Sequence, residues 1–306
     1  MDMKSEKNWP ILNFAELQNT LDTIHQWVQI VGKIRMEAMP WQNHSWHSTL
    51  YITSSGFSTQ SITYKGQIFQ IDFDFIQHKL LIQYSNTETI SMELVPRTVA
   101  DFYKELFDKL AIIGIDVKIY ARPNEMEPSI PFAENIVNKT YDPEVANTIW
   151  RAMLKSSCVF NEFRGQFVGK CSPVHLFWGA FDLAVTRFSG NVAPLYQGSM
   201  PNMPLKVMQE AYSQEVSSAG FWPGSKDSPM PVFYSYAYPS DPSFADQKVQ
   251  PSEAFYDTDM QEFFLKYEDV QKSDDPEKTL YDFLQTTYEA AANTSNWNRI
   301  KLEKQS

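Results

Sequence analysis

The sequence predicts an α+β fold in which two antiparallel β-sheets are flanked by long helices. One observation is an apolar stripe with helical spacing between Leu12 and Met39, and a second is the two-residue alternation that replaces it between Ser48 and Leu94. The third is that the second half of the chain repeats this order of helix, strands and helix. With 43% hydrophobic residues in 306, the chain can bury a large core.

The first helix is predicted over residues 12–39. Asn13 is expected to be its N-cap, with Glu16 reaching back as in a capping box, and Pro40 ends it. The apolar residues recur at spacings of three and four, which places them on one face of the helix: Phe14, Leu17, Leu21, Ile24, Val28 and Val31.

An antiparallel meander is predicted from Ser48 to Leu94, because short polar links separate the alternating runs. Asp72 and Asp74 alternate with apolar residues in one run. Two carboxylates at this spacing could form a metal or acid–base pair, but the solvated outer face of a half-buried strand is the favoured interpretation.

A second helix should start at Thr98 and end at Gly114, and the alternation from Ile115 to Ile119 predicts a strand after it. Residues 122–141 follow as a linker, because Arg122–Pro131 holds three prolines and little to bury. The predicted organisation is a half at 1–121, the linker, and a half at 142–306.

The second half is predicted to open with Asp142 as N-cap and Pro143 at the first helical position. The Asp275-Pro276 pair should open the last helix in the same way, with frayed residues after Asn293. Between these helices the sequence predicts strands at 173–188, around 211–219 and at 231–238, and a long loop at 193–206.

The two halves share short sequence matches as well as their order of elements. Residues 29–33, QIVGK, recur as residues 166–170, QFVGK, each near the end of a long helix. An internal duplication is therefore a hypothesis, and it would place a ligand crevice between two similar halves.

Charge and composition exclude several classes of function. The net charge of −11 and pI near 5.0 disfavour a nucleic-acid partner, and no window approaches the length of a membrane-spanning helix. The first ten residues carry no apolar leader, so we expect a cytoplasmic protein. The two cysteines, Cys158 and Cys171, form no metal-binding pattern, and His44 and His47 are not expected to bind a metal. Common nucleotide-binding and hydrolase motifs are absent, and no cofactor is indicated.

The most apolar stretch, residues 172–190 (SPVHLFWGAFDLAVTRFSG), carries a histidine, an aspartate and an arginine. Gly179-Ala180 predicts a two-residue type II′ turn that pairs Leu176 with Leu183 and leaves one face dry. His175 and Asp182 then share the other face and are candidates for a catalytic imidazole and the carboxylate that orients it. The alternative is a buried structural histidine, which we favour.

Further ligand-binding candidates surround this hairpin. Arg187 could clamp an anion or pair with Glu215, the ion pair being the favoured interpretation. Trp222 belongs to a rigid aromatic turn, and Tyr234 and Tyr236 share one face of a strand, so these rings could line a small-molecule pocket or simply cover a sheet.

The chain resembles an uncharacterised bacterial family catalogued as domain of unknown function 5996. The resemblance rests on long aromatic motifs that span nearly the whole sequence: WPILNFAELQNTLDTIHQWVQIVGKIR, PWQNHSWHSTLYITSSG, IDFDFIQHKLLIQ, GKCSPVHLFWGAFDLAVTRFSG and SAGFWPGS. It implies a bacterial, cytosolic protein with a single family unit over most of its length, and it transfers no activity, cofactor or catalytic residue.

The sequence therefore leads to two hypotheses from different classes. The first is a small-molecule-binding protein or enzyme with a polar and aromatic pocket beside the 173–188 hairpin. The second is a non-enzymatic interaction or scaffold protein in which the same residues are structural. An enclosed cavity lined by His175, Asp182 and Trp222 favours the first. A packed interior with a flat exposed aromatic patch favours the second.

Overall fold

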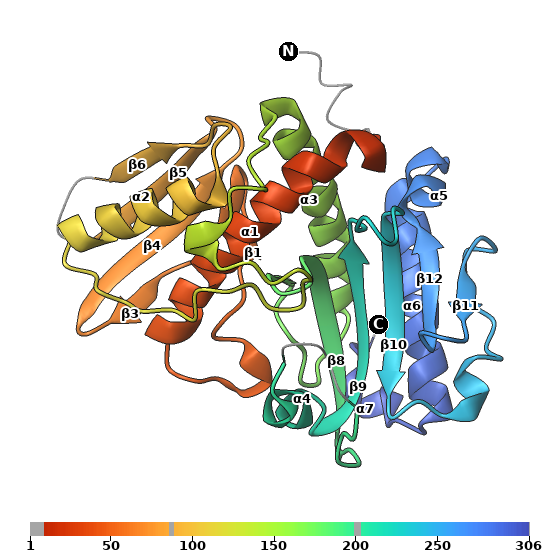
Figure 1. Ribbon diagram of the computed structural model, residues 1–306. Helices are drawn as coiled ribbons and strands as arrows, with labels where there is room; N and C mark the ends of the chain where they lie inside the picture. The colour runs from red at the N-terminus through yellow and green to blue at the C-terminus, as the bar shows by residue number, and fades with distance from the viewer. Residues whose placement is uncertain (1–8, 86–88, 199–202, 306) are drawn as a thin grey trace.

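The computed structural model describes residues 9–85, 89–198 and 203–305. Over these residues the chain forms two six-stranded antiparallel sheets and seven α-helices, so the predicted α+β fold is confirmed (Figure 1). None of the helices in this part of the chain is long and apolar enough to cross a membrane.

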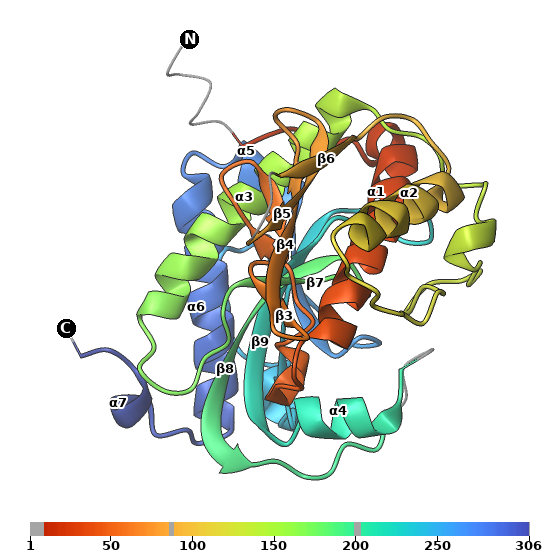
Figure 2. The same cartoon turned by 90° about the vertical axis from the view of Figure 1, so that its left-hand side faces the viewer.

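The first sheet has the order β1-β2-β4-β5-β6, and β3 pairs with β4 outside this path. α1 and α2 cover one of its faces (Figure 2), where Trp27 of α1 stacks on Phe102 of α2 at 4.7 Å and Phe102 stacks on Phe73 of β4 at 6.4 Å. The elements are α1 (Phe14–Ala38), β1 (Tyr51–Ile52), β2 (Gly56–Ser58), β3 (Ile62–Tyr64), β4 (Gln67–Asp74), β5 (Lys79–Tyr84), β6 (Ile90–Glu93) and α2 (Val99–Ile112).

The helix boundaries agree with the sequence prediction, although one cap differs. Thr98 accepts from the backbone N–H of Asp101 at 3.0 Å, as predicted. The expected capping box at Asn13 is wrong, because its side-chain amide donates to the Glu16 carboxylate at 2.9 Å and caps no backbone N–H.

The predicted strand at residues 115–119 is also wrong. Ile115 and Val117 are buried, but the backbone there joins neither sheet. An extended segment that buries alternate residues produces the same sequence pattern as a strand.

Asp72 and Asp74 both accept hydrogen bonds from neighbouring groups of the first sheet. Asp72 accepts from the side-chain amides of Gln70 and Gln83 at 2.8 and 2.9 Å. Asp74 is buried and accepts from the backbone N–H groups of Ile76 and Gln77, both at 2.8 Å. One carboxylate therefore lies among surface amides and the other stabilises the β4–β5 turn.

The second sheet has the order β11-β12-β10-β9-β8-β7. α3 and α6 lie behind it in Figure 1 and cover one face, and the other face looks toward the viewer. The elements are α3 (Pro143–Gly165), β7 (His175–Phe177), β8 (Asp182–Val192), α4 (Leu205–Ala211), β9 (Gln214–Trp222), β10 (Val232–Tyr238), β11 (Phe255–Asp257), β12 (Glu262–Lys266), α5 (Tyr267–Lys272), α6 (Pro276–Thr294) and α7 (Arg299–Leu302).

Both predicted N-caps of the second half are present. Asp142 accepts from two backbone N–H groups of α3, and Asp275 accepts from the N–H of Lys278 at 3.0 Å. Two predictions are corrected. The strands β11 and β12 were not expected, and the residues after Asn293 are not frayed, because α7 forms there and the carbonyl of Leu302 accepts from Val168 N at 2.8 Å.

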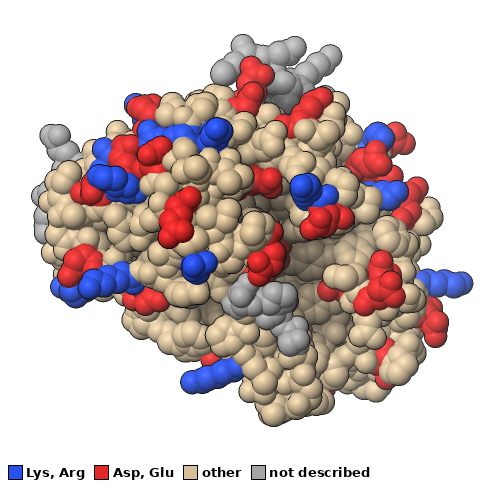
Figure 3. All heavy atoms as spheres, viewed as in Figure 1, with Lys and Arg blue, Asp and Glu red and all other residues tan. Residues whose placement is uncertain are grey.

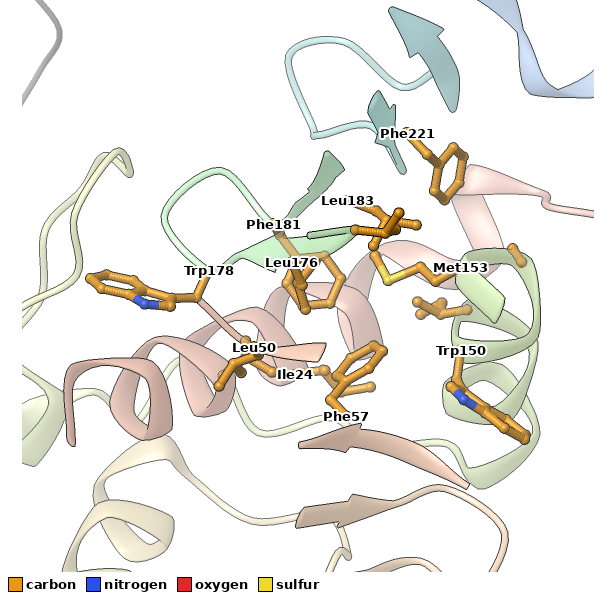
Figure 4. Close-up of a cluster of buried hydrophobic side chains, with 14 of the residues drawn as sticks. Ile24, Leu50, Phe57, Trp150, Met153, Leu176, Trp178, Phe181, Leu183 and Phe221 are labelled. Atoms are coloured by element: carbon orange, nitrogen blue, oxygen red, sulfur yellow. The ribbon is translucent and has the colours of Figure 1, made fainter. Parts of the chain in front are cut away.

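One hydrophobic core joins the two halves. Figure 4 shows side chains from α1, α3, β2 and the β7–β8 hairpin meeting between the sheets, among them Ile24, Met153, Phe57 and Leu183. Leu50 and Leu176 exchange both backbone hydrogen bonds, at 3.0 and 2.8 Å, and so connect the start of β1 with β7. The 122–141 segment also contributes to the core through Phe132, which is fully buried. The division at 122–141 and the internal duplication stay predictions.

Candidate functional site

The strand register places a set of polar side chains on the uncovered face of the second sheet, called here the open face. Ala184, Gly220 and Tyr234 are directly paired across β8, β9 and β10. Because side chains alternate along a strand, the open face carries Asp182, Thr186, Ser218, Tyr234, Tyr236 and Glu262. Figure 3 shows this side of the molecule hollowed over these strands, with several Asp and Glu side chains bordering the hollow.

Tyr234 and Asp182 form the central contact of the open face. The Tyr234 hydroxyl donates a short hydrogen bond to Asp182 Oδ2 across the intervening strand β9. The ring can cross because residue 220 is glycine: a Cβ there would lie 2.3 Å from both Cζ and Oη of Tyr234. Burial raises the pKa of Asp182 to about 6, and the hydrogen bond from Tyr234 opposes that rise.

A second tyrosine lies parallel to the first. The rings of Tyr234 and Tyr236 have centroids 6.2 Å apart and an interplanar angle of 17°. The hydroxyls of Tyr236 and Tyr212 are 3.1 Å apart, and those of Thr186 and Ser218 are 2.8 Å apart on the same face. These bonds fix the rings in place and leave hydroxyl groups along the floor of the hollow.

Glu262 adds a second carboxyl group to the open face from β12. Burial raises its pKa to about 7, and the neighbouring carboxylates of Asp182 and Asp257 contribute to this rise. The sequence did not indicate this residue as a candidate. The alternation of EFFLK, in which Phe263 and Leu265 are buried, is the signal that could have located its strand.

Glu125 brings a third carboxyl group from the 122–141 segment. A Cβ on Gly179 would lie 1.9 Å from Glu125 Oε1, so the carboxyl group rests directly on the hairpin turn. The pKa of Glu125 is raised to about 7, mainly by burial and also by the carboxylate of Asp182, and Lys33 opposes the rise. This residue lies in the proline-rich stretch predicted as a linker, where the sequence gives no signal of chemistry.

Polar side chains of α1 hold the turn and this segment together. His25 Nε2 donates to the carbonyls of Trp178 and Gly179 at 3.0 and 2.8 Å. Gln29 donates to the carbonyls of Gly179 and Asn124 at 3.1 and 2.8 Å and accepts from Asn124 N at 2.8 Å. The helix therefore positions both the hairpin tip and the segment that carries Glu125.

Lys33, one turn further along α1, is a buried cation beside Glu125. Its ammonium donates to the side-chain carbonyl of Asn124 and lies 5.1 Å from the ring centroid of Trp178. Burial lowers its pKa to about 8, and the carboxylates of Glu37 and Glu125 oppose this. This lysine was likewise not indicated by the sequence.

The hairpin has the predicted register but a different turn. Leu176 pairs with Leu183, and Phe177 pairs with Asp182, so the turn spans residues 178–181. The type II′ prediction is wrong, because the positive φ of 62° falls at Phe181 and not at Gly179. Glycine is needed at residue 179 because Glu125 approaches closely, and not because the backbone there has a positive φ.

The structure does not join His175 to Asp182. The His175 side chain is fully buried, neither ring nitrogen has a hydrogen-bond partner among the described residues, and the ring packs edge-on against Phe177 at 4.5 Å. Burial lowers its pKa to about 3. His175 is therefore a neutral, buried side chain that makes no hydrogen bond to Asp182, although the strand register places the two residues on the same face of the sheet.

Arg187 lies on the opposite face of the sheet. Its guanidinium is buried 3.4 Å from the ring centroid of Phe163 and 4.3 Å from that of Tyr288, and it donates to the carbonyl of Phe163. The expected ion pair with Glu215 does not form, because that carboxylate accepts from Ser189 and Asn191 at 2.7 and 3.1 Å. Neither residue lies at the centre of the open face.

Trp222 borders the open face next to Asp182. Its indole N–H donates to the carbonyl of Ala180 at 3.2 Å, which fixes the ring against the hairpin turn, and the side chain is partly exposed. Of the seven sequence-predicted candidates, Asp182, Trp222, Tyr234 and Tyr236 are thus brought together on one face.

A pocket of about 550 Å³ opens at the end of the open face, beside Tyr236 and Glu262. We call it the tyrosine pocket, because Tyr212, Tyr236, Tyr238 and Tyr256 contribute to its walls together with Asp241 and Glu262. Within the described ranges, no three His, Cys, Asp or Glu side chains are grouped so that they could hold a metal ion.

Comparison with known proteins places the chain in a family. Neither a search of curated proteins nor a search of solved structures found a match. A family model described as a family of unknown function (DUF5996) matches residues 9–304. This match covers nearly the whole chain, and the protein therefore belongs to the DUF5996 family.

Proposed function

We propose that the protein binds a small molecule on the open face of its second sheet, beside the 173–188 hairpin. The observation that carries this proposal is the Tyr234–Asp182 hydrogen bond built across Gly220. A sheet face that only has to be covered would carry apolar side chains packed against another element. This face instead holds fixed hydroxyl and carboxyl groups in a hollow, as small-molecule sites do.

The three carboxyl groups suit proton exchange with a ligand. The pKa of Asp182 is about 6, and those of Glu125 and Glu262 are about 7, so each group changes charge close to neutrality. If the bound molecule reacts, Asp182 is the acid or base that we expect to act on it, with Tyr234 as its hydrogen-bond donor. Binding is the proposed function, and catalysis would build on it.

The charge of the site limits its partners. An acidic hollow in a chain with a net charge of −11 disfavours anionic ligands and nucleic acid. The cysteine content and the family resemblance also support, as part of this proposal, a cytoplasmic location in a bacterium.

Thermal unfolding in the presence of a metabolite library tests the proposal. A compound that binds the native state raises the melting temperature, so hits should stabilise wild type and lose this effect in Asp182→Asn. Asp72→Asn is the matched control, because it makes the same change on the first sheet, where Asp72 accepts hydrogen bonds from amide side chains.

Two results would count against the proposal. Hits that stabilise Asp182→Asn as much as wild type would place the binding site elsewhere. A library in which nothing shifts the wild type would favour the alternative, a scaffold protein in which these side chains are structural.

A further inference from the structure

The tyrosine pocket has the size and composition of a recognition site. Its volume of about 550 Å³ lies within the range of small-molecule pockets, roughly 300–1,000 Å³. It lies between β10, β11, β12 and the C-terminal end of α4, and it adjoins the open face at Tyr236 and Glu262.

The tyrosine rings that line it are fixed by contacts with one another. The ring of Tyr212 lies 4.9 Å from those of Tyr196 and Tyr238, measured between centroids. The Tyr212 hydroxyl is 3.1 Å from that of Tyr236, and the Tyr238 hydroxyl donates to the carbonyl of Pro194 at 2.8 Å. All are partly exposed, so fixed ring surfaces face the pocket.

The pocket carries only negative charge. Of the residues that line it, all within the described part of the chain, Asp241 and Glu262 are acidic and none is Lys or Arg. Asp241 accepts from the backbone N–H of Ser243 at 2.8 Å and caps a short helix. Among the described residues, the charged groups that act on the Glu262 carboxyl group are Asp182 and Asp257, both acidic, and no cation or hydrogen-bond donor offsets them.

Aromatic faces and an uncompensated carboxylate together favour an organic cation. The negative face of an aromatic ring attracts a cation without satisfying hydrogen bonds, which suits an ammonium group whose protons are replaced by methyl groups. A metal ion would need a group of close carboxylate or imidazole ligands, and the described residues form none here.

We propose that the tyrosine pocket binds a methylated ammonium group, with Tyr212, Tyr236, Tyr238 and Tyr256 as aromatic walls and Glu262 as the counter-charge. This inference rests on the proposed function, because it assigns the chemical class of the molecule that the open face receives. The rest of that molecule would extend along the open face toward Tyr234 and Asp182.

Calorimetric titration of the full chain tests this with choline and its uncharged isostere 3,3-dimethylbutan-1-ol. Choline should bind at least about tenfold more tightly than the isostere, because only choline gains the cation–π and charge attraction. Tyr256→Leu and Glu262→Gln should each weaken choline binding by about 3- to 30-fold, and Tyr256→Phe, which keeps the ring, should restore it. Tyr84→Leu and Glu93→Gln on the first sheet are the matched controls and should change nothing.

Equal affinity for choline and the isostere would overturn the inference, as would the absence of choline binding at millimolar concentration. The proposed function is judged separately by the metabolite library. A neutral hit that depends on Asp182 would leave that function standing while the cation assignment fails. Circular dichroism of each variant shows that a lost signal is not lost folding.

Discussion

The crossing of Tyr234 over Gly220 can be tested by substituting Gly220→Ala. The added Cβ would lie 2.3 Å from Cζ and Oη of the Tyr234 ring, well inside van der Waals contact. The ring must therefore move, but its hydroxyl is bonded to Asp182 and its face is parallel to Tyr236. We expect the substitution to break the Tyr234–Asp182 bond or to strain the strands.

The expected loss of stability is set by whichever costs less free energy, breaking the Tyr234–Asp182 hydrogen bond or straining the strands. Breaking a hydrogen bond to a charged group costs about 1.5–3 kcal/mol, reduced here because both side chains are partly exposed, and overpacking costs about 1–3 kcal/mol. Alanine is favoured over glycine in a strand by about 0.5–1 kcal/mol, which offsets part of this cost. Gly220→Ala should therefore lower the free energy of unfolding by about 1–2 kcal/mol.

The assay is urea unfolding of Gly220→Ala in two backgrounds, wild type and Tyr234→Ala. Without the ring, the atoms nearest to the new methyl group are gone, so in the second background the substitution should be neutral or stabilise by up to about 1 kcal/mol. The reasoning is refuted if Gly220→Ala costs the same in both backgrounds, since the backbone and not Tyr234 would then require the glycine.

Three further predictions concern caps and titrating groups. Asp142→Ala should lower the free energy of unfolding by about 0.5–2 kcal/mol, because two N–H groups of α3 lose their acceptor; a change within error in urea unfolding would contradict it. Glu262 has a pKa of about 7 in the folded protein, above its ordinary 4.5. The folded protein therefore binds this proton more tightly than the unfolded chain, and the free energy of unfolding falls as pH rises and the proton is lost. Glu262→Gln should therefore stabilise the protein at about pH 8 and not at about pH 4, and a pH-independent difference would count against this. His175, with its pKa lowered to about 3, binds a proton only when unfolded, so wild-type stability should fall as pH drops below about 6.5. Between about pH 7 and 5 the free energy of unfolding of His175→Leu should fall less than that of wild type. Identical pH dependence of the two proteins would contradict this account.

Local sequence signals predicted much of the fold. The caps at Thr98, Asp142 and Asp275 depend on side chains within three residues of the N–H groups they bond, so the sequence contains the whole interaction. The 173–188 hairpin register was predictable for the same reason, because alternation and a short turn determine which residues pair.

Features that depend on distant residues were not predictable. The space that glycine leaves at residue 179 is filled by Glu125, which is far away in the sequence and lies in a segment without a regular pattern. Alternation placed Arg187 on the dry side of its strand, but the rings of Phe163 and Tyr288 that hold it come from two helices. Glu125, Glu262 and Lys33, which the sequence did not indicate, reach the site through such contacts between elements.

The two backbone hydrogen bonds between Leu50 and Leu176 let each half of the chain cover a sheet edge of the other. These residues pair at the β1 edge of the first sheet and at the β7 edge of the second. An unpaired edge strand is a template for association with other chains. Either half expressed alone would expose such an edge together with its share of the common core, and we expect it to aggregate where the intact chain does not.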